Sequence, residues 1–186
     1  KPMSYKHNAP FRYDVVGSFL RPDVLKQARA DHAAGVIDDA ALTAVENEAI
    51  RDLVAKQKAA GLHVITDGEF RRSYWHLDFM WGLQGIERRT SRTGYMFHDE
   101  ETTADTAVVT GKISGENHPF VEHFKFVKAL EDENTVAKLT IPAPAQFIEQ
   151  MIMPFALENT RMYYADNREL AEDIAAGYKK VIADVD

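Results

Sequence analysis

Short apolar segments alternate with amphipathic helical segments along this chain, and this alternation restricts the possible folds more than any other feature. The clearest example is a helix that begins after Asp38 or Asp39 and ends at Gly61, followed directly by a strand at 63–66. The apolar face of this helix comprises Leu42, Val45, Ala49, Ile50, Leu53 and Val54. A helix between two strands is typical of a parallel crossover unit, so we predict an α/β fold with a parallel sheet and helices outside it.

The same patterns predict the other elements. Strands are expected at 13–19, 63–66, 107–113 and 136–141, and helices at 21–34, 38–61, 119–130, 145–153 and 167–184. Residues 83–115 depart from the alternation and are predicted to form an excursion or hairpin insertion, with a polar loop at 98–105. A (β/α)8 barrel needs eight strands and ~250 residues. The pattern therefore leaves two possibilities for one domain of residues 1–186: a small open sheet or part of a barrel.

Composition excludes several classes of function. The chain carries 22 Lys and Arg against 29 Asp and Glu, a net charge of −7, which disfavours nucleic acid because its binding depends on neutralising phosphates. No apolar stretch reaches the ~20 residues of a membrane helix, and residues 1–6 lack the apolar core of a signal peptide, so we expect a cytoplasmic protein without a membrane partner. There is no cysteine, and the seven histidines form no closely spaced set, so no metal site is predicted within this segment.

Special residues stand at three predicted strand ends, where function gathers in parallel α/β folds. Gly17 and Ser18 offer backbone N–H groups and a hydroxyl that could hold a carboxylate or phosphate, or they form an ordinary turn. Asp67 and Glu69 flank a glycine, and a carboxylate there could bind an ammonium group or transfer a proton, or the segment is simply an acidic turn. The third strand end is the segment 142–144.

A basic pair and an aromatic segment follow the acidic turn. Arg71 and Arg72 could grip a phosphate, pair with the acidic turn, or lie on a solvated surface. Trp75, His76 and Asp78 combine aromatic surface with a carboxylate, which suits a flat heterocyclic ligand, although a loop that covers the core would have the same composition.

Three segments, read in order, resemble the catalytic domain of cobalamin-independent methionine synthase, and most closely the short single-domain relatives of that enzyme. They are Val15-Val16-Gly17-Ser18-Phe19-Leu20-Arg21-Pro22, Gly61-Leu62-His63-Val64-Ile65-Thr66-Asp67-Gly68-Glu69-Phe70-Arg71-Arg72 and Trp75-His76-Leu77-Asp78-Phe79. The resemblance covers essentially the whole chain. It implies a (β/α)8 TIM barrel of the porphyrin decarboxylase and methionine synthase type, of which this chain is the N-terminal half.

The resemblance also implies an activity: transfer of a methyl group, independently of vitamin B12, to the thiol of homocysteine in methionine biosynthesis. Gly17 and Ser18 are expected to contact the amino acid, and Glu69 to bind its amino group near a methyltetrahydrofolate donor. Further substrate or methyl-donor contacts are expected from Asp67, Arg72, Trp75, His76 and Asp78. The full-length methionine synthases usually have histidine at the position of Asp67, whereas the short relatives are similar to this chain. The identity of the methyl donor is therefore left open.

Members of this family activate the thiol with zinc, which is held by His, Cys, Glu and Cys ligands on the later barrel strands. None of those motifs occurs in this sequence. We therefore expect the zinc ligands to lie beyond residue 186, and we expect no catalytic residue in this segment, which alone would be inactive.

Two alternatives remain. The same type of barrel also moves alkyl groups to other thiols, such as coenzyme M, or decarboxylates porphyrins, although the turn at 67–69 favours an amino acid ligand over a porphyrin. The other alternative is a non-catalytic module that binds a small molecule or a partner subunit. Half a barrel exposes sheet edges and an apolar face, so a partner or a homo-oligomer would be expected.

Overall fold

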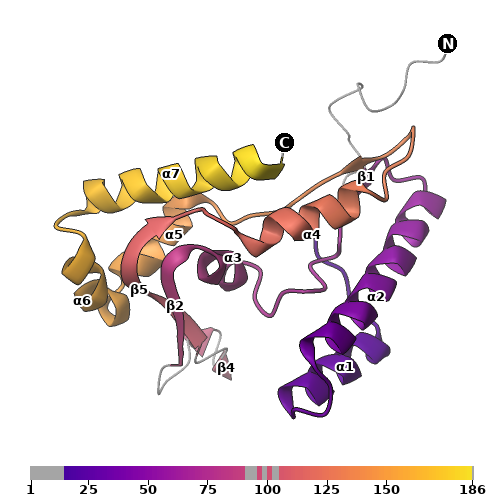
Figure 1. The fold of residues 1–186 in the computed structure, drawn as a ribbon, viewed down its shortest axis with the longest axis horizontal. Helices are drawn as coiled ribbons and strands as arrows, with labels where there is room; N and C mark the ends of the chain where they lie inside the picture. Colours follow the sequence, from indigo (N-terminus) through magenta and orange to yellow (C-terminus); the bar gives the residue numbers. More distant parts are fainter. Residues whose placement is uncertain (1–14, 91–95, 98–99, 102–104, 186) are drawn as a thin grey trace. The chain divides into compact units, whose positions relative to one another are not determined.

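A computed structural model describes residues 15–90, 96–97, 100–101 and 105–185 of the chain. Helices and short strands are mixed along the sequence (Figure 1), which makes this a mixed α/β protein. The chain divides into two compact units. Unit 1 comprises the residues up to 72 together with 122–140, and unit 2 comprises 73–121 and 141–186.

Unit 1 contains two long helices and one parallel pair of strands. Its elements are α1 (Asp23–Ala33), α2 (Asp39–Ala59), β1 (Val64–Ile65), most of α4 (Pro119–Lys128) and β6 (Val136–Ala137). In the parallel pair, Val64 lies opposite Val136 and Ile65 lies opposite Ala137. The two strands therefore end at the same edge, and the segments that follow them are neighbours.

Helix α2 carries much of the unit 1 core. Asp38 caps it by accepting a hydrogen bond from the backbone N–H of Ala41 at 2.8 Å, and Gly61 follows its end with a φ of 80°, which glycine adopts without strain. The buried face of α2 packs in a cluster with other apolar residues of unit 1. The buried members of this cluster are Leu25, Ala49, Ile50, Leu53, Val54, Ile65, Phe70, Val127 and Ala137. The helical pattern in the sequence is thus explained by burial of one face.

Unit 2 combines antiparallel strands with helices. Its elements are α3 (Leu77–Gly82), β2 (Gln84–Thr90), β3 (Met96–Phe97), β4 (Glu100–Glu101), β5 (Asp105–Ser114), the start of α4, α5 (Pro144–Ile152), α6 (Pro154–Tyr163) and α7 (Asn167–Val185). Strands β2 and β5 are antiparallel, with Ile86 opposite Val109 and a register shift at Gly85. Gly85 has a φ of 79°, and a side chain there would meet the carbonyl of Lys112 at 2.4 Å.

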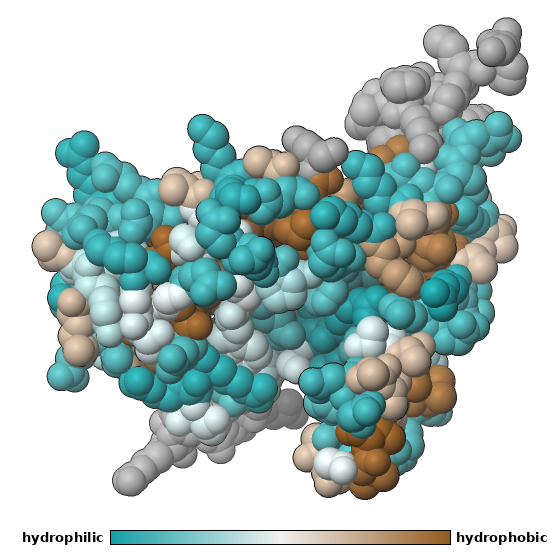
Figure 2. All heavy atoms as spheres, viewed as in Figure 1, coloured by the Kyte–Doolittle hydropathy of each residue, from teal (hydrophilic) through white to brown (hydrophobic). Residues whose placement is uncertain are grey.

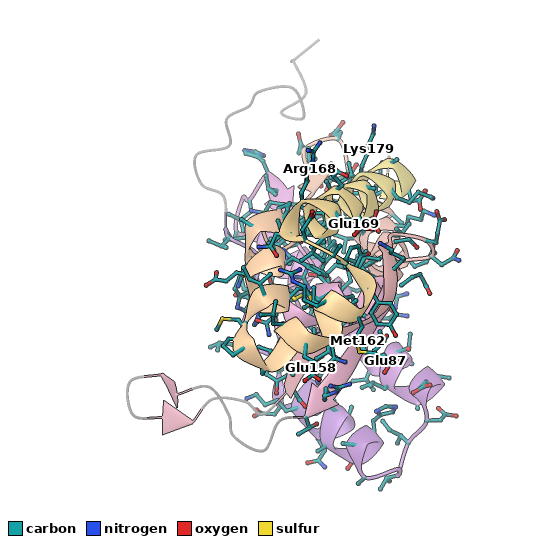
Figure 3. All side chains as sticks on the ribbon, turned by 90° about the vertical axis from the view of Figure 1, so that its left-hand side faces the viewer. Glu87, Glu158, Met162, Arg168, Glu169 and Lys179 are labelled. Atoms are coloured by element: carbon teal, nitrogen blue, oxygen red, sulfur yellow. The ribbon has the colours of Figure 1, made fainter. Side chains whose placement is uncertain are left out.

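Helix α7 shows how unit 2 buries its apolar surface. Leu170, Ile174 and Val181 are at most 1% exposed, whereas the outward face of the helix is mostly hydrophilic (Figure 2). Arg168 and Lys179 extend away from this helix (Figure 3). None of the helices among the described residues is long and apolar enough to cross a membrane.

The predicted helices were largely confirmed, and so was the strand predicted at 107–113, which extends over Asp105–Ser114, but the strands predicted at 63–66 and 136–141 were too long. The strand predicted at 13–19 is wrong for residues 15–19, the part that the structure describes. This segment makes isolated contacts, such as the bond from the N–H of Phe19 to the carbonyl of Gly68 at 3.1 Å, in place of a strand ladder. The strand predicted at 136–141 comprises only Val136–Ala137, and farther along the carbonyl of Thr140 accepts from the Arg72 side chain.

The prediction of one continuous parallel sheet is also corrected. Among the described residues β1 and β6 form the parallel pair, whereas β2 and β5 are antiparallel. No helix was predicted at α3 or α6, and β2 was not resolved as a separate strand within the excursion expected at 83–115. Helix α3 spans only six residues, too few to show a helical period, and β2 is mostly exposed and polar. The predicted single domain of residues 1–186 stays a prediction.

Replacing Tyr164 with phenylalanine is expected to destabilise unit 2. The side chain is fully buried, its hydroxyl accepts a hydrogen bond from the N–H of Ile113 at 2.6 Å, and it donates one to Asp173 at 2.8 Å. Burial raises the pKa of Tyr164, so the hydroxyl keeps the proton that it donates. Loss of the hydroxyl leaves both partners unsatisfied, at a cost of about 1–3 kcal/mol.

Thermal unfolding followed by circular dichroism measures this change. Tyr163→Phe, at the neighbouring half-buried position, is the matched control and should leave the melting temperature unchanged. Equal melting temperatures for Tyr164→Phe and the parent chain would contradict the structural role of this hydroxyl.

Candidate functional site

The turn that follows β1 is held by the side chains of Gln57 and Thr66. Gln57 of α2 forms two hydrogen bonds with the backbone of Thr66, at 2.8 and 3.0 Å. The Thr66 hydroxyl donates to the carbonyl of Gly17 at 2.8 Å and accepts from the N–H of Gly68 at 3.1 Å. Thr66 therefore ties the Gly17 turn to the acidic turn, and two of the predicted strand ends lie side by side.

Gly17 lies where a larger residue would collide with its neighbours. A Cβ at this position would lie 2.6 Å from Cγ2 of Thr140 and 3.4 Å from Oε1 of Glu69. The neighbouring Ser18 has an exposed side chain. Of the three predicted substrate contacts, Gly17 and Glu69 are thus in contact range of each other, and Ser18 is adjacent in sequence.

Glu69 has a fixed backbone in a conformation that is rare outside glycine, with a φ of 59°. Its N–H donates to Oδ1 of Asp67 at 2.8 Å. The Arg21 guanidinium donates to the carbonyl of Glu69 at 2.8 Å and to that of Arg72 at 2.5 Å. These contacts compensate for the strain and hold the turn in one shape.

The two carboxylate oxygens of Glu69 differ: Oε1 accepts a hydrogen bond from a neighbouring side chain, and Oε2, called the open oxygen below, accepts none from the described residues. Oε1 accepts from the Thr140 hydroxyl at 2.8 Å and lies 3.3 Å from Nη1 of Arg72. Oε2 makes no hydrogen bond with the residues that the structure describes, although the carboxylate as a whole pairs with Arg72. A carboxylate oxygen in this state can accept a hydrogen bond from a ligand ammonium group.

The other charged groups of the turn are engaged within the protein. Asp67 is 8% exposed and accepts from the turn backbone, and Arg72 is 3% exposed and donates to the carbonyl of Thr140 at 2.6 Å. Arg71 lies 2.9 Å from Glu46 and 2.5 Å from Asn47. Both guanidinium groups thus contact internal partners, although Nε of Arg71 is buried without a hydrogen bond to the described residues, and a phosphate-binding role for the Arg71–Arg72 pair stays a prediction.

The remaining predicted contacts lie in unit 2, at the start of α3. Trp75 is 51% exposed, and its ring lies 4.8 Å from the ring of His76. Nδ1 of His76 is buried and has no hydrogen-bond partner within the described ranges, and burial lowers the pKa of His76 although Asp78 opposes this shift. Asp78 accepts from the N–H groups of Ser73 and Tyr74, so its carboxylate holds the loop.

The described residues do not fit a zinc ion. No group of three His, Asp or Glu side chains within the described ranges could hold a metal. His118, for example, is buried, with Nε2 2.8 Å from the carbonyl of Phe79 and Nδ1 accepting from the N–H of Phe120. We therefore derive no catalytic step through a metal from these residues.

Sequence reasoning missed Thr140, Thr66 and Arg21 as parts of the site. A usable signal was present for Thr140, because it lies near the end of a predicted strand, two residues before the segment 142–144. Residues that follow neighbouring parallel strands meet at one edge, so Thr140 could have been paired with Glu69. Arg21 gave no such signal, because its role depends on backbone carbonyls.

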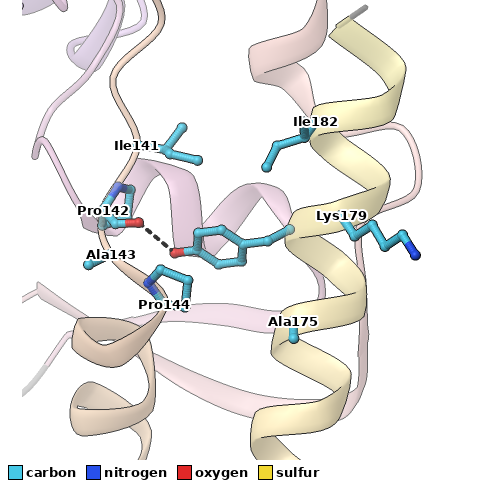
Figure 4. Close-up of a pocket in the computed structure, with 8 residues that line it drawn as sticks. Ile141, Pro142, Ala143, Pro144, Ala175, Lys179 and Ile182 are labelled. Carbon is cyan, nitrogen blue, oxygen red and sulfur yellow. Dashed lines mark hydrogen bonds between the residues drawn. The ribbon is translucent and has the colours of Figure 1, made fainter.

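A hollow lies in unit 2 between the segment 141–144 and α7 (Figure 4), with a volume of about 500 Å³. It is lined by Ile141, Pro142, Ala143, Pro144, Ala175, Tyr178, Lys179 and Ile182. The Tyr178 hydroxyl donates to the carbonyl of Pro142 at 2.9 Å, and Lys179 points away from the hollow. Binding sites combine apolar walls with converging polar groups, which this hollow lacks, so we place the candidate site at Glu69.

The family is established by comparison with known proteins. Residues 11–147 match the family model described as the catalytic domain of cobalamin-independent synthase. The uncharacterised protein YxjH of Bacillus subtilis (strain 168) is 41% identical over 177 residues, which are 95% of this chain and 45% of that protein. A methionine synthase of Sulfolobus acidocaldarius is 28% identical over 161 residues, 87% of this chain and 44% of that protein.

A solved structure agrees with these matches. A crystal structure from Listeria monocytogenes, assigned to the vitamin-B12-independent methionine synthases, superposes with a TM-score of 0.73 and 38% identity, covering 95% of this chain and 48% of the other. The chain therefore belongs to the cobalamin-independent methionine synthase family. It spans less than half the length of these relatives.

Proposed function

We propose that this chain supplies the amino acid-binding part of a methyltransferase that methylates the thiol of homocysteine. The observation that carries the proposal is the open Oε2 of Glu69 beside the turn of Gly17 and Ser18. Homocysteine carries an ammonium group, which a carboxylate binds through charge-assisted hydrogen bonds. The exposed Ser18 hydroxyl and the backbone N–H groups of its turn suit the carboxylate of the same ligand.

We further propose that the chain forms the N-terminal half of a (β/α)8 barrel. The parallel pair β1–β6 supports this, since the residues of the candidate site follow the carboxyl ends of both strands, where barrel enzymes place their sites. The likeness to the Listeria monocytogenes structure over 95% of this chain supports it as well.

The proposal assigns different roles to the other predicted contacts. Trp75 and His76 are proposed to contact a flat methyl donor, such as a methyltetrahydrofolate, whereas Asp67, Arg72 and Asp78 shape the turns around the ligands. Zinc, when bound, would stabilise the thiolate of the substrate. We propose that its ligands belong to a part of the whole enzyme other than the described residues, and that the enzyme works in the cytoplasm.

Isothermal titration calorimetry of the chain with three thiols tests the proposal. Homocysteine should bind, and 4-mercaptobutyrate, which lacks the amino group, should bind at least about tenfold more weakly, because one hydrogen bond to a charged group is lost. Coenzyme M should also bind weakly. Equal affinities for homocysteine and coenzyme M would favour alkyl transfer to another thiol, and no binding of homocysteine would contradict the proposal.

A further inference from the structure

We propose that Thr140 is a positioning residue that determines which oxygen of Glu69 faces the ligand. This inference rests on the proposed function, because it takes Glu69 as the group that binds the substrate ammonium. Thr140 lies 71 residues from Glu69 in the sequence, and its hydroxyl donates to Oε1 at 2.8 Å.

The backbone on both sides of this contact is fixed. Arg21 and Asp67 hold the backbone of Glu69. The carbonyl of Thr140 accepts from Nη2 of Arg72 at 2.6 Å, and its methyl group lies against Gly17. The orientation of the Glu69 carboxylate therefore depends on the side-chain contacts of Oε1.

Two groups face Oε1 of Glu69 at different distances: the Thr140 hydroxyl and the Arg72 guanidinium. The Thr140 hydroxyl is at hydrogen-bond distance, whereas Nη1 of Arg72 is farther away at 3.3 Å. A guanidinium prefers to bind a carboxylate through two parallel hydrogen bonds, which would engage both oxygens. The hydroxyl holds Oε1 away from that arrangement, so Oε2 stays open for an ammonium group.

Removal of the hydroxyl should let the carboxylate turn onto Arg72. Oε2 would then be occupied by the guanidinium, and a ligand ammonium would have to displace it. The loss should therefore be specific to ligands that carry an amino group. If Thr140 contributed only by packing, its replacement would weaken the binding of every ligand to the same degree, whether or not the ligand carries an amino group.

The test compares Thr140→Val, which keeps the shape without the donor, with Thr140→Ser, which keeps the donor. Calorimetry of the whole 186-residue chain with homocysteine and with 4-mercaptobutyrate gives the readout. We expect Thr140→Val to weaken homocysteine binding about tenfold and to leave 4-mercaptobutyrate unchanged. Thr140→Ser should restore homocysteine binding to within about threefold of the parent.

The outcomes separate this inference from the proposed function. If the parent binds homocysteine and Thr140→Val binds it equally well, or loses both ligands to the same degree, the role of Thr140 is overturned while the proposed function stands. A parent that binds no homocysteine contradicts both. Thr140→Ala provides a second variant without the hydroxyl if the valine variant does not fold, and the same amino-specific loss is expected from it.

Discussion

Glu69→Gln should lower the affinity of the chain for homocysteine about 100-fold. The open Oε2 of Glu69 is the proposed partner of the ligand ammonium, and the amide of glutamine has no negative charge to offer. Removal of one partner from a hydrogen-bonded charge pair typically costs 2–5 kcal/mol, and about 2.7 kcal/mol corresponds to 100-fold. The affinity for 4-mercaptobutyrate should change little, because that ligand has no ammonium group.

Glu48→Gln is the matched control for this experiment. Glu48 lies on α2 with 80% of its side chain exposed, so the variant makes the same change of charge away from the turn. Homocysteine affinity in this control should equal that of the parent. A similar loss in both variants would mean that net charge, and not the Glu69 carboxylate, governs binding.

Glu46→Gln should lower the melting temperature by about 6–12 °C. Glu46 lies 2.9 Å from Arg71 and 3.5 Å from Arg29, and the side chains of Glu46 and Arg71 are 9% and 8% exposed. The neutral amide leaves a buried guanidinium without its counter-charge, at a cost of about 3 kcal/mol. For a chain of this size, each kcal/mol shifts the melting temperature by about 2–4 °C.

The exposed ion pair of Glu48 and Arg51, also on α2, provides the control for this prediction. Glu48 lies 3.5 Å from Arg51 with both side chains largely exposed, and such surface pairs contribute at most about 1 kcal/mol. Differential scanning calorimetry of the two variants should therefore give a much larger shift for Glu46→Gln. Equal shifts would contradict the structural role of the buried pair.

Helices of this protein could be predicted from the sequence because their signals are local. The cap at Asp38 and the stop at Gly61 both depend on residues within one turn of the helix end. The apolar stripe of α2 corresponds to a face that is buried in the structure. Strands were less predictable, since their length depends on partners that lie far away in the sequence.

The candidate site could be predicted only in part. The turns at Gly17 and Glu69 were visible as glycines and carboxylates at strand ends, and the structure brings them together. Thr140 and Arg21 act through a single hydroxyl and through backbone carbonyls of distant residues. The position of Thr140 near a predicted strand end was the one local signal, whereas the contacts of Arg21 leave no pattern in the sequence, because they depend on how the chain folds.

The most direct test of the central claim is a crystal structure of the chain with homocysteine bound. We expect the ligand nitrogen to lie about 2.7–3.2 Å from Oε2 of Glu69, with the Thr140 hydroxyl still bonded to Oε1. A ligand nitrogen that contacts other groups while Oε2 of Glu69 faces solvent would contradict it.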